Sequence, residues 1–99
     1  MSSTINNELR DSIIALDGDR AKSAVIDGIN AGLDPLEMIN RGIRPALDFM
    51  GERFGNGDLF LPELVLAAKA SDLAVSVLEP ELAKRDVKKE KLEKYFSRL

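Results

Sequence analysis

The stretch of residues 34–64, DPLEMINRGIRPALDFMGERFGNGDLFLPEL, contains two helix starts and the turn that separates them. Asp34 followed by Pro35 is typical of a helix start, because aspartate caps free N–H groups and proline suits the first helical position. Apolar residues then recur every three or four positions, which predicts a helix over 35–54. Pro45 lies inside this helix and lacks an N–H donor, so we expect a kink there.

The second half of the stretch predicts a turn and a new helix. Residues 55–58, Gly-Asn-Gly-Asp, end the first helix, because glycine and asparagine favour turn conformations. Leu61 precedes a proline and is therefore biased toward extended backbone. Pro62 then begins a helix that we expect to run to about Glu79, where Pro80 interrupts it.

The residues before this stretch also follow helical spacing. They predict helices over 5–16 and 20–31, separated by Asp17-Gly18-Asp19. We expect Gly18 to take a left-handed conformation at the end of the first helix and Asp19 to cap the second.

The residues after Pro80 predict one more helix over about 81–98. Four apolar residues would share one of its faces: Leu92, Tyr95, Phe96 and Leu99. The chain is therefore predicted to be all-α, an antiparallel four-helix bundle with an additional C-terminal helix. We divide it into a helical bundle over 1–82 and a basic amphipathic helix over 83–99.

Composition excludes several classes of function. The 99 residues contain no cysteine and no histidine, so thiolate chemistry, disulfides and histidine-based catalysis or metal binding are excluded. Residues 1–83 carry seven Lys/Arg against fourteen Asp/Glu, whereas 84–99 carry seven against three. An acidic body is a poor surface for nucleic acid. With neither an apolar run of membrane length nor a signal-like N-terminus, we expect a cytoplasmic protein without membrane contact.

The predicted helix over 62–79 has two apolar stripes. One stripe suits the core: Leu66, Ala67, Ala70, Leu73, Ala74, Val77 and Leu78. The other follows i, i+4, i+7, i+11 spacing through Leu64, Ala68, Ser71 and Val75. The second stripe packs another helix of the bundle, contacts a second copy of the chain, or belongs to a surface for a flat ligand. That surface, the apolar platform, would consist of Phe54, Phe60, Leu61, Leu64 and Ala68.

The sequence resembles the N-terminal helical cap domain of corrinoid (cobalamin-binding) methyltransferase proteins. That family includes cobalamin-dependent methionine synthase and the methanol and methylamine corrinoid proteins. The resemblance covers roughly residues 4–82 and is most specific in GERFGNGDLFLPEL, residues 51–64. It implies a four-helix cap over the methyl-bearing face of the corrin ring. Phe54, Phe60 and Leu61, with Leu64 one turn on, would shield the cobalt–methyl bond from water.

The chain departs from the family pattern beyond the cap. Relatives continue into an α/β domain with an Asp-x-His-x-x-Gly motif, whose histidine can bind cobalt from below. The 99 residues contain no histidine and no such motif. A corrinoid would therefore need an α/β domain or a methyltransferase from elsewhere as partner.

The sequence thus supports three functions. The first is a cobalamin-binding cap module of a methyl-transfer system, without catalysis by the chain alone. The alternative is a cap-derived interaction or oligomerisation protein that has lost corrinoid binding. The third is an adaptor that docks on a methyltransferase. An uncovered apolar platform is a large patch for a monomer, so we expect a homo-oligomer, most simply a dimer.

Overall fold

The computed structural model describes residues 2–84, and within that range it contains helices, turns and no strand. The elements are α1 (Ser2–Ile14), α2 (Gly18–Asn30), α3 (Pro35–Met38), η1 (Ile39–Ile43), α4 (Arg44–Gly55) and α5 (Leu61–Ala83). The segments α3, η1 and α4 follow one another without a break and act as one long helix. The predicted all-α fold is therefore confirmed, with four helices in the bundle.

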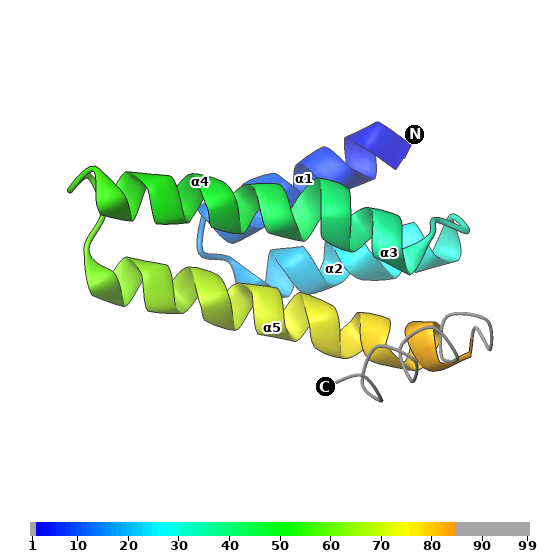
Figure 1. The fold of residues 1–99 in the computed structure, drawn as a ribbon. Helices are drawn as coiled ribbons and strands as arrows, with labels where there is room; N and C mark the ends of the chain where they lie inside the picture. The colour runs from blue at the N-terminus through cyan, green and yellow to red at the C-terminus, as the bar shows by residue number, and fades with distance from the viewer. Residues whose placement is uncertain (1, 85–99) are drawn as a thin grey trace, which may run out of the picture.

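Successive helices run in opposite directions along the bundle (Figure 1). The most extensive contacts join α2 to α5 and α1 to α2, and η1 with α4 packs against α1. By contrast, α4 and α5 share few contacts although they are consecutive. The bundle is thus closed on three sides and more open along the seam between α4 and α5.

Capping explains most of the helix boundaries. The Asp34 carboxylate accepts a hydrogen bond from the Leu36 N–H at 2.9 Å, and Pro35 follows at the first helical position, as predicted. The end of α2 has Gly32 at φ 80°, and the Leu33 N–H donates to the Gly28 carbonyl at 2.9 Å. This arrangement satisfies carbonyls that the helix end would otherwise leave unpaired.

The α1–α2 turn differs from its prediction. Leu16, and not Gly18, takes the left-handed conformation, with φ at 62°. Asp17, and not Asp19, caps α2, because its carboxylate accepts from the Arg20 N–H at 3.1 Å. Gly18 is instead the first residue of α2 and lies against α5. The close approach of α5 accounts for glycine there, so the prediction from turn chemistry was wrong by two residues.

Two prolines act differently from each other. A π-helical turn, η1, directly precedes α4 and Pro45, and within it the Arg44 N–H donates to the Ile39 carbonyl. The register change occurs where proline removes a helical donor. Pro80 does not interrupt α5, which continues to Ala83. The carbonyl that loses its donor belongs to Ser76, which is exposed to water, so the predicted break was wrong. Beyond Lys84 the predicted C-terminal helix lies outside the described residues.

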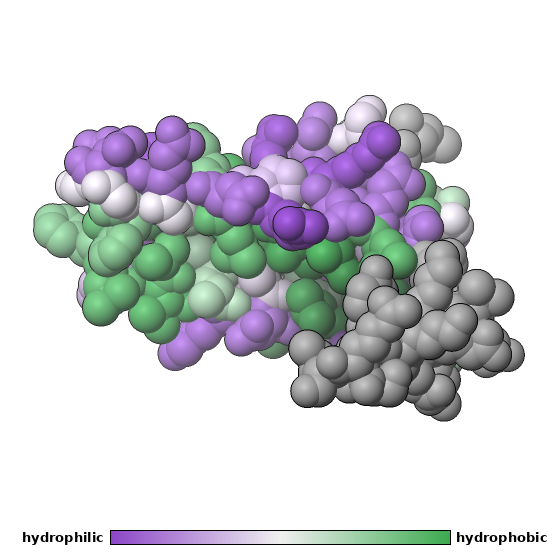
Figure 2. Space-filling view, viewed as in Figure 1, coloured by the Kyte–Doolittle hydropathy of each residue, from purple (hydrophilic) through white to green (hydrophobic). Residues whose placement is uncertain are grey.

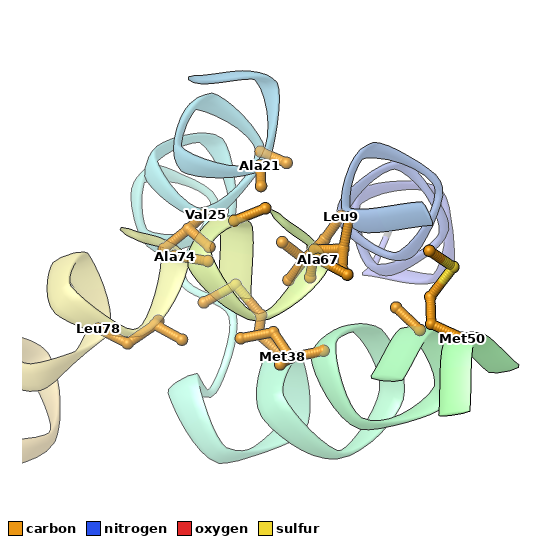
Figure 3. Close-up of a cluster of buried hydrophobic side chains, with 13 residues drawn as sticks. Leu9, Ala21, Val25, Met38, Met50, Ala67, Ala74 and Leu78 are labelled. Carbon is orange, nitrogen blue, oxygen red and sulfur yellow. The ribbon is translucent and has the colours of Figure 1, made fainter. Parts of the chain in front are cut away.

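Small and medium-sized apolar side chains fill the centre of the bundle (Figure 3). Leu9 and Ile13 of α1, Val25 of α2, Met38 of α3 and Leu78 of α5 are fully or almost fully buried. Ala67, Ala70 and Ala74 of α5 allow the neighbouring helices to come close. These contacts fix the helices relative to one another, and they also position the C-terminal end of α4 and the N-terminal end of α5.

Candidate functional site

The end of α4 and the start of α5 extend beyond the α1–α2 turn. A methyl group built on Gly18, where α2 begins, would lie 2.6 Å from Leu73 Cδ1 and 3.6 Å from Ala70 Cα. Leu61 precedes Ala70 by nine residues, so α5 begins about 13 Å before α2 does. Figure 1 shows this overhang at the left end of the molecule. The first residues of α5 therefore lie beyond the reach of α2.

Hydrogen bonds define the turn that joins the two helices of the overhang. Gly57 has φ at 81°, its N–H donates to the Phe54 carbonyl at 3.1 Å, and the Asp58 N–H donates to the Arg53 carbonyl at 2.9 Å. Across the turn, the Phe60 N–H donates to Glu63 Oε1 at 3.2 Å. The backbones of both aromatic residues are therefore fixed by local hydrogen bonds, whatever their side chains contact.

The apolar platform divides into exposed and half-buried members. Phe60 is 78% exposed, Leu61 58% and Phe54 40%, which is unusual for apolar residues of this size. Ala68 is also exposed, whereas Leu64 is half-buried and packs against the core. Figure 2 shows apolar surface gathered at this left end, below the polar surface of α4. The two residues with the most exposed side chains are thus neighbours at the helix start.

The buried face of α5 is rotated around the helix axis relative to the predicted core face. Leu66 and Leu73, predicted to be core residues, are 47% and 44% exposed. Ser71 is buried instead and its hydroxyl donates to the Ala67 carbonyl at 3.0 Å, while Val75 packs against the core. Leu66 lies in the overhang before α2 begins, which explains its exposure. Helical periodicity alone does not show where a neighbouring helix starts.

The second apolar stripe of α5 lies on the side of the helix that faces α4. We call it the platform stripe, because it contains the platform residues Leu64 and Ala68. Leu73 and Ala70 face Gly18, so that side of the helix belongs to α2. At about 100° per residue, Leu64 and Ala68 lie roughly 120–220° further around the helix than these two residues. They therefore face the seam between α4 and α5, where contacts within the bundle are few. Phe54 ends α4 beside the same seam.

The platform offers apolar contacts and no group for proton transfer. No group of three or more Asp or Glu side chains among residues 2–84 is arranged to hold a metal ion. The pKa of the Glu8 carboxyl is lowered by its hydrogen bonds to Arg20, but this pair joins α1 to α2, outside the platform. All five platform side chains are apolar. They are suited to cover an apolar surface.

The sequence patterns missed two exposed apolar residues beside the platform. Val65 is 45% exposed and Leu66 47% exposed, and both lie in the first turns of α5. Neither belongs to the platform stripe, and Leu66 was assigned to the core. The signal that would have found them is the position of Gly18, which sets where α2 begins along α5.

None of the helices in the described part of the chain combines the length and apolar character needed to cross a bilayer.

Comparisons with known proteins converge on one family. A family model described as B12 binding domain matches residues 5–79. Trimethylamine corrinoid protein 2 of Methanosarcina acetivorans is 39% identical over 79 residues, which are 80% of this chain and 36% of that protein. Monomethylamine corrinoid protein 2 of Methanosarcina mazei is 31% identical over 86 residues, 87% of this chain and 39% of that protein.

A solved structure shows the same fold. The monomethylamine corrinoid protein of Methanosarcina barkeri superposes with a TM-score of 0.79 at 28% identity, covering 83% of this chain and 39% of that one. The chain therefore spans about two fifths or less of the length of these relatives. The platform residues, 54–68, all fall inside the matched range.

Proposed function

Because the chain belongs to the B12 binding domain family, we propose that it is the helical cap that covers one face of a corrinoid in a methyl-transfer system. The observation that carries the proposal is the exposure of Phe60 and Leu61 at the open α4–α5 end, inside the matched residues. A contiguous exposed apolar patch on a protein surface is typical of a ligand-binding or interaction site.

The platform fits one face of a corrin ring and no more. Phe54, Phe60, Leu61, Leu64 and Ala68 would lie against the ring, and Ala68 is small enough to let a flat group come near. The sequence contains no histidine, so a lower cobalt ligand of that kind would come from another domain. When bound, the corrinoid would carry a methyl group on cobalt.

The contribution of this chain would be to exclude water from the covered face. Burying a large apolar side chain is worth about 1.5–3 kcal/mol, so Phe60 and Leu61 together favour a covered state. A dry, apolar cover protects a reactive bond from side reactions. A methyltransferase that needs the same face has to displace the cap, which requires contact that is strong but reversible.

The partners follow from this incomplete site. We propose an α/β corrinoid-binding domain for the other face of the ring, a methyltransferase as methyl donor or acceptor, a second copy of the chain, and a cytoplasmic location. The alternative function is a cap-derived interaction protein that uses its exposed apolar residues only for self-association. That alternative would use the same exposed Phe60, and the match of residues 5–79 to the B12 binding domain favours the corrinoid cap, so the experiment must separate the two.

The test is a titration of the 99-residue chain with methylcobalamin, in which NMR records the chemical-shift changes of the backbone amides. We expect shifts concentrated at residues 54–68, and their loss in Phe60→Ser. The matched control is Phe49→Ser, because Phe49 is an exposed phenylalanine (41%) on α4, outside the platform, and Arg53 covers its ring at 5.7 Å. Shifts that spread over the surface, or that survive in Phe60→Ser, would favour the alternative function.

A further inference from the structure

The outer face of α5 carries an open hollow with a volume of about 390 Å³. Its lining is Lys69, Asp72, Leu73 and Ser76. These positions follow i, i+3, i+4, i+7 spacing, which is the four-residue hole that receives a side chain when two helices pack knobs-into-holes. The hollow lies outside the platform stripe.

The same helix offers a side chain that would fill such a hole. Leu66 is 47% exposed and lies one turn before Lys69, in line with Leu73 but ahead of the start of α2. Val65 beside it is 45% exposed. No residue of α2 covers this part of α5, because α2 begins at the level of Ala70. One exposed helix face thus carries both the protruding and the receiving group.

We infer that this face pairs with its own copy, α5 against α5, in an antiparallel two-fold dimer. The arrangement would insert Leu66 of each chain into the Lys69–Asp72–Leu73–Ser76 hollow of the other. The hollow is centred between residues 72 and 73, so the two-fold axis would pass near residue 69. A surface that holds a knob and its hole on one helix is self-complementary, as a two-fold interface requires.

Charge supports a second copy as the occupant. Near the axis, Lys69 of each chain would meet Asp72 of the other, closing a neutral cluster of two ammonium and two carboxylate groups. Opposite charges placed in this way fix the register of a helix pair. If an acidic helix of another protein bound this face instead, Asp72 would lie beside negative charge. If a basic helix bound it, Lys69 would lie beside positive charge.

The inference specifies the self-association proposed above and does not depend on corrinoid binding. The outer face of α5 and the α4–α5 seam lie on different sides of the helix, so dimerisation would leave the platform open. The antiparallel arrangement would direct the two platforms to opposite ends of the dimer. One helix face buries less than the roughly 800 Å² per partner of a standard interface. We therefore expect half-dissociation at about 100 µM, an order-of-magnitude value.

The first test is sedimentation of the chain over a wide concentration range. We expect the mass to rise from 10.9 kDa toward twice that value, and Leu66→Glu to stay monomeric. Ile26→Glu is the matched control, because Ile26 is 41% exposed on α2, and its dimer should match the wild type. Lys69→Glu and Asp72→Lys should each weaken the dimer at least tenfold, and the double variant should restore it.

A second test does not depend on these variants folding equally well. The chain has no cysteine, so Lys69→Cys should form a disulfide between copies under oxidation, whereas Ser76→Cys, far from the axis, should not. A dimer that survives Leu66→Glu but is lost in Phe60→Asp would overturn the inference and assign self-association to the platform. A wild type that stays monomeric would also overturn it, and a lower Tm for Leu66→Glu would then assign the hollow to residues 85–99 of the same chain.

Discussion

Asn6 is the buried side chain whose chemistry fits its surroundings least. It is 2% exposed on α1, and neither its amide nitrogen nor its amide oxygen has a hydrogen-bond partner among the described residues. Ser12, also buried on α1, differs because its hydroxyl donates to the Leu9 carbonyl at 2.7 Å. An unsatisfied buried polar group costs about 1–3 kcal/mol of desolvation.

Removing the polarity of Asn6 should therefore stabilise the fold, and adding charge should destabilise it. We expect Asn6→Leu to match or exceed the wild-type free energy of unfolding at pH 7. Asn6→Asp should lose several kcal/mol there, because it buries a carboxylate without a partner. Burial raises the pKa of such a carboxyl in the folded state, so the loss should shrink as pH falls toward 4. Urea unfolding at pH 7 and pH 4 measures both effects, and a strongly destabilised Asn6→Leu would contradict the explanation.

The Glu8–Arg20 pair predicts a small acid dependence of stability. Arg20 donates to both Glu8 carboxylate oxygens, at 2.5 and 2.6 Å, and lowers the pKa of Glu8 from 4.5. A lowered folded-state pKa adds stability above the unfolded pKa, and this is lost as pH falls below 4.5. Because both side chains are about half exposed, Glu8→Gln should lower Tm by only about 1–3 °C at pH 7. Thermal melts should show the difference disappearing in acid, and a constant difference would contradict it.

Single residues in and near the platform were predictable to different degrees. Phe60 and Leu61 precede Pro62 at a helix start, so local sequence already separates them from any helical core face. Leu66 was not predictable in the same way, because its exposure depends on where α2 begins. Turn chemistry likewise misplaced the left-handed residue from Leu16 to Gly18, since tertiary contact with α5 gives glycine its role.

At the scale of the helices, capping residues and prolines predicted most of the helix boundaries. Asp34-Pro35 predicted the start of α3, and Gly57 the end of α4, because each satisfies backbone groups by local chemistry. Pro80 failed as a stop signal, because losing one hydrogen bond on an exposed helix face is tolerated near a helix end. The π-helical turn η1 was expected only as a kink, since its register depends on packing against α1.

Close packing of η1 against α1 gives a matched pair of glycine variants. A methyl group on Gly42 would lie 2.8 Å from Leu9 Cδ2 and 3.3 Å from the Asn6 carbonyl oxygen. Gly42→Ala should therefore cost about 1–3 kcal/mol through overpacking. Gly51 lies inside α4 with no atom within 4 Å of the added methyl, so Gly51→Ala should stabilise by about 0.5–1 kcal/mol. Chemical denaturation of both variants tests this, and equal effects would show that the α1–η1 contact is looser than described.

At the scale of the whole molecule, the overhang of α4 and α5 explains why the platform is open. The two helices extend beyond the α1–α2 turn, and few contacts join them to each other. Helix lengths other than that of α5 could be predicted approximately from sequence, but the relative shift of the helices along the bundle could not, because it depends on contacts such as Gly18 with Leu73. The same shift gives the molecule an uncovered apolar end and an uncovered outer face of α5.

That one-sided site predicts weak cobalamin binding by the chain alone. The proposed platform would cover one ring face, and no histidine in the sequence can supply an axial ligand from the other. Binding must also repay the lost freedom of both partners, so most of the apolar contact energy is consumed. We expect a dissociation constant of roughly 0.1–1 mM for methylcobalamin by calorimetry. Phe60→Ser should abolish the measurable heat, whereas Phe49→Ser should leave it unchanged. Nanomolar binding by the purified chain would contradict the one-face site and require ring contacts beyond the platform.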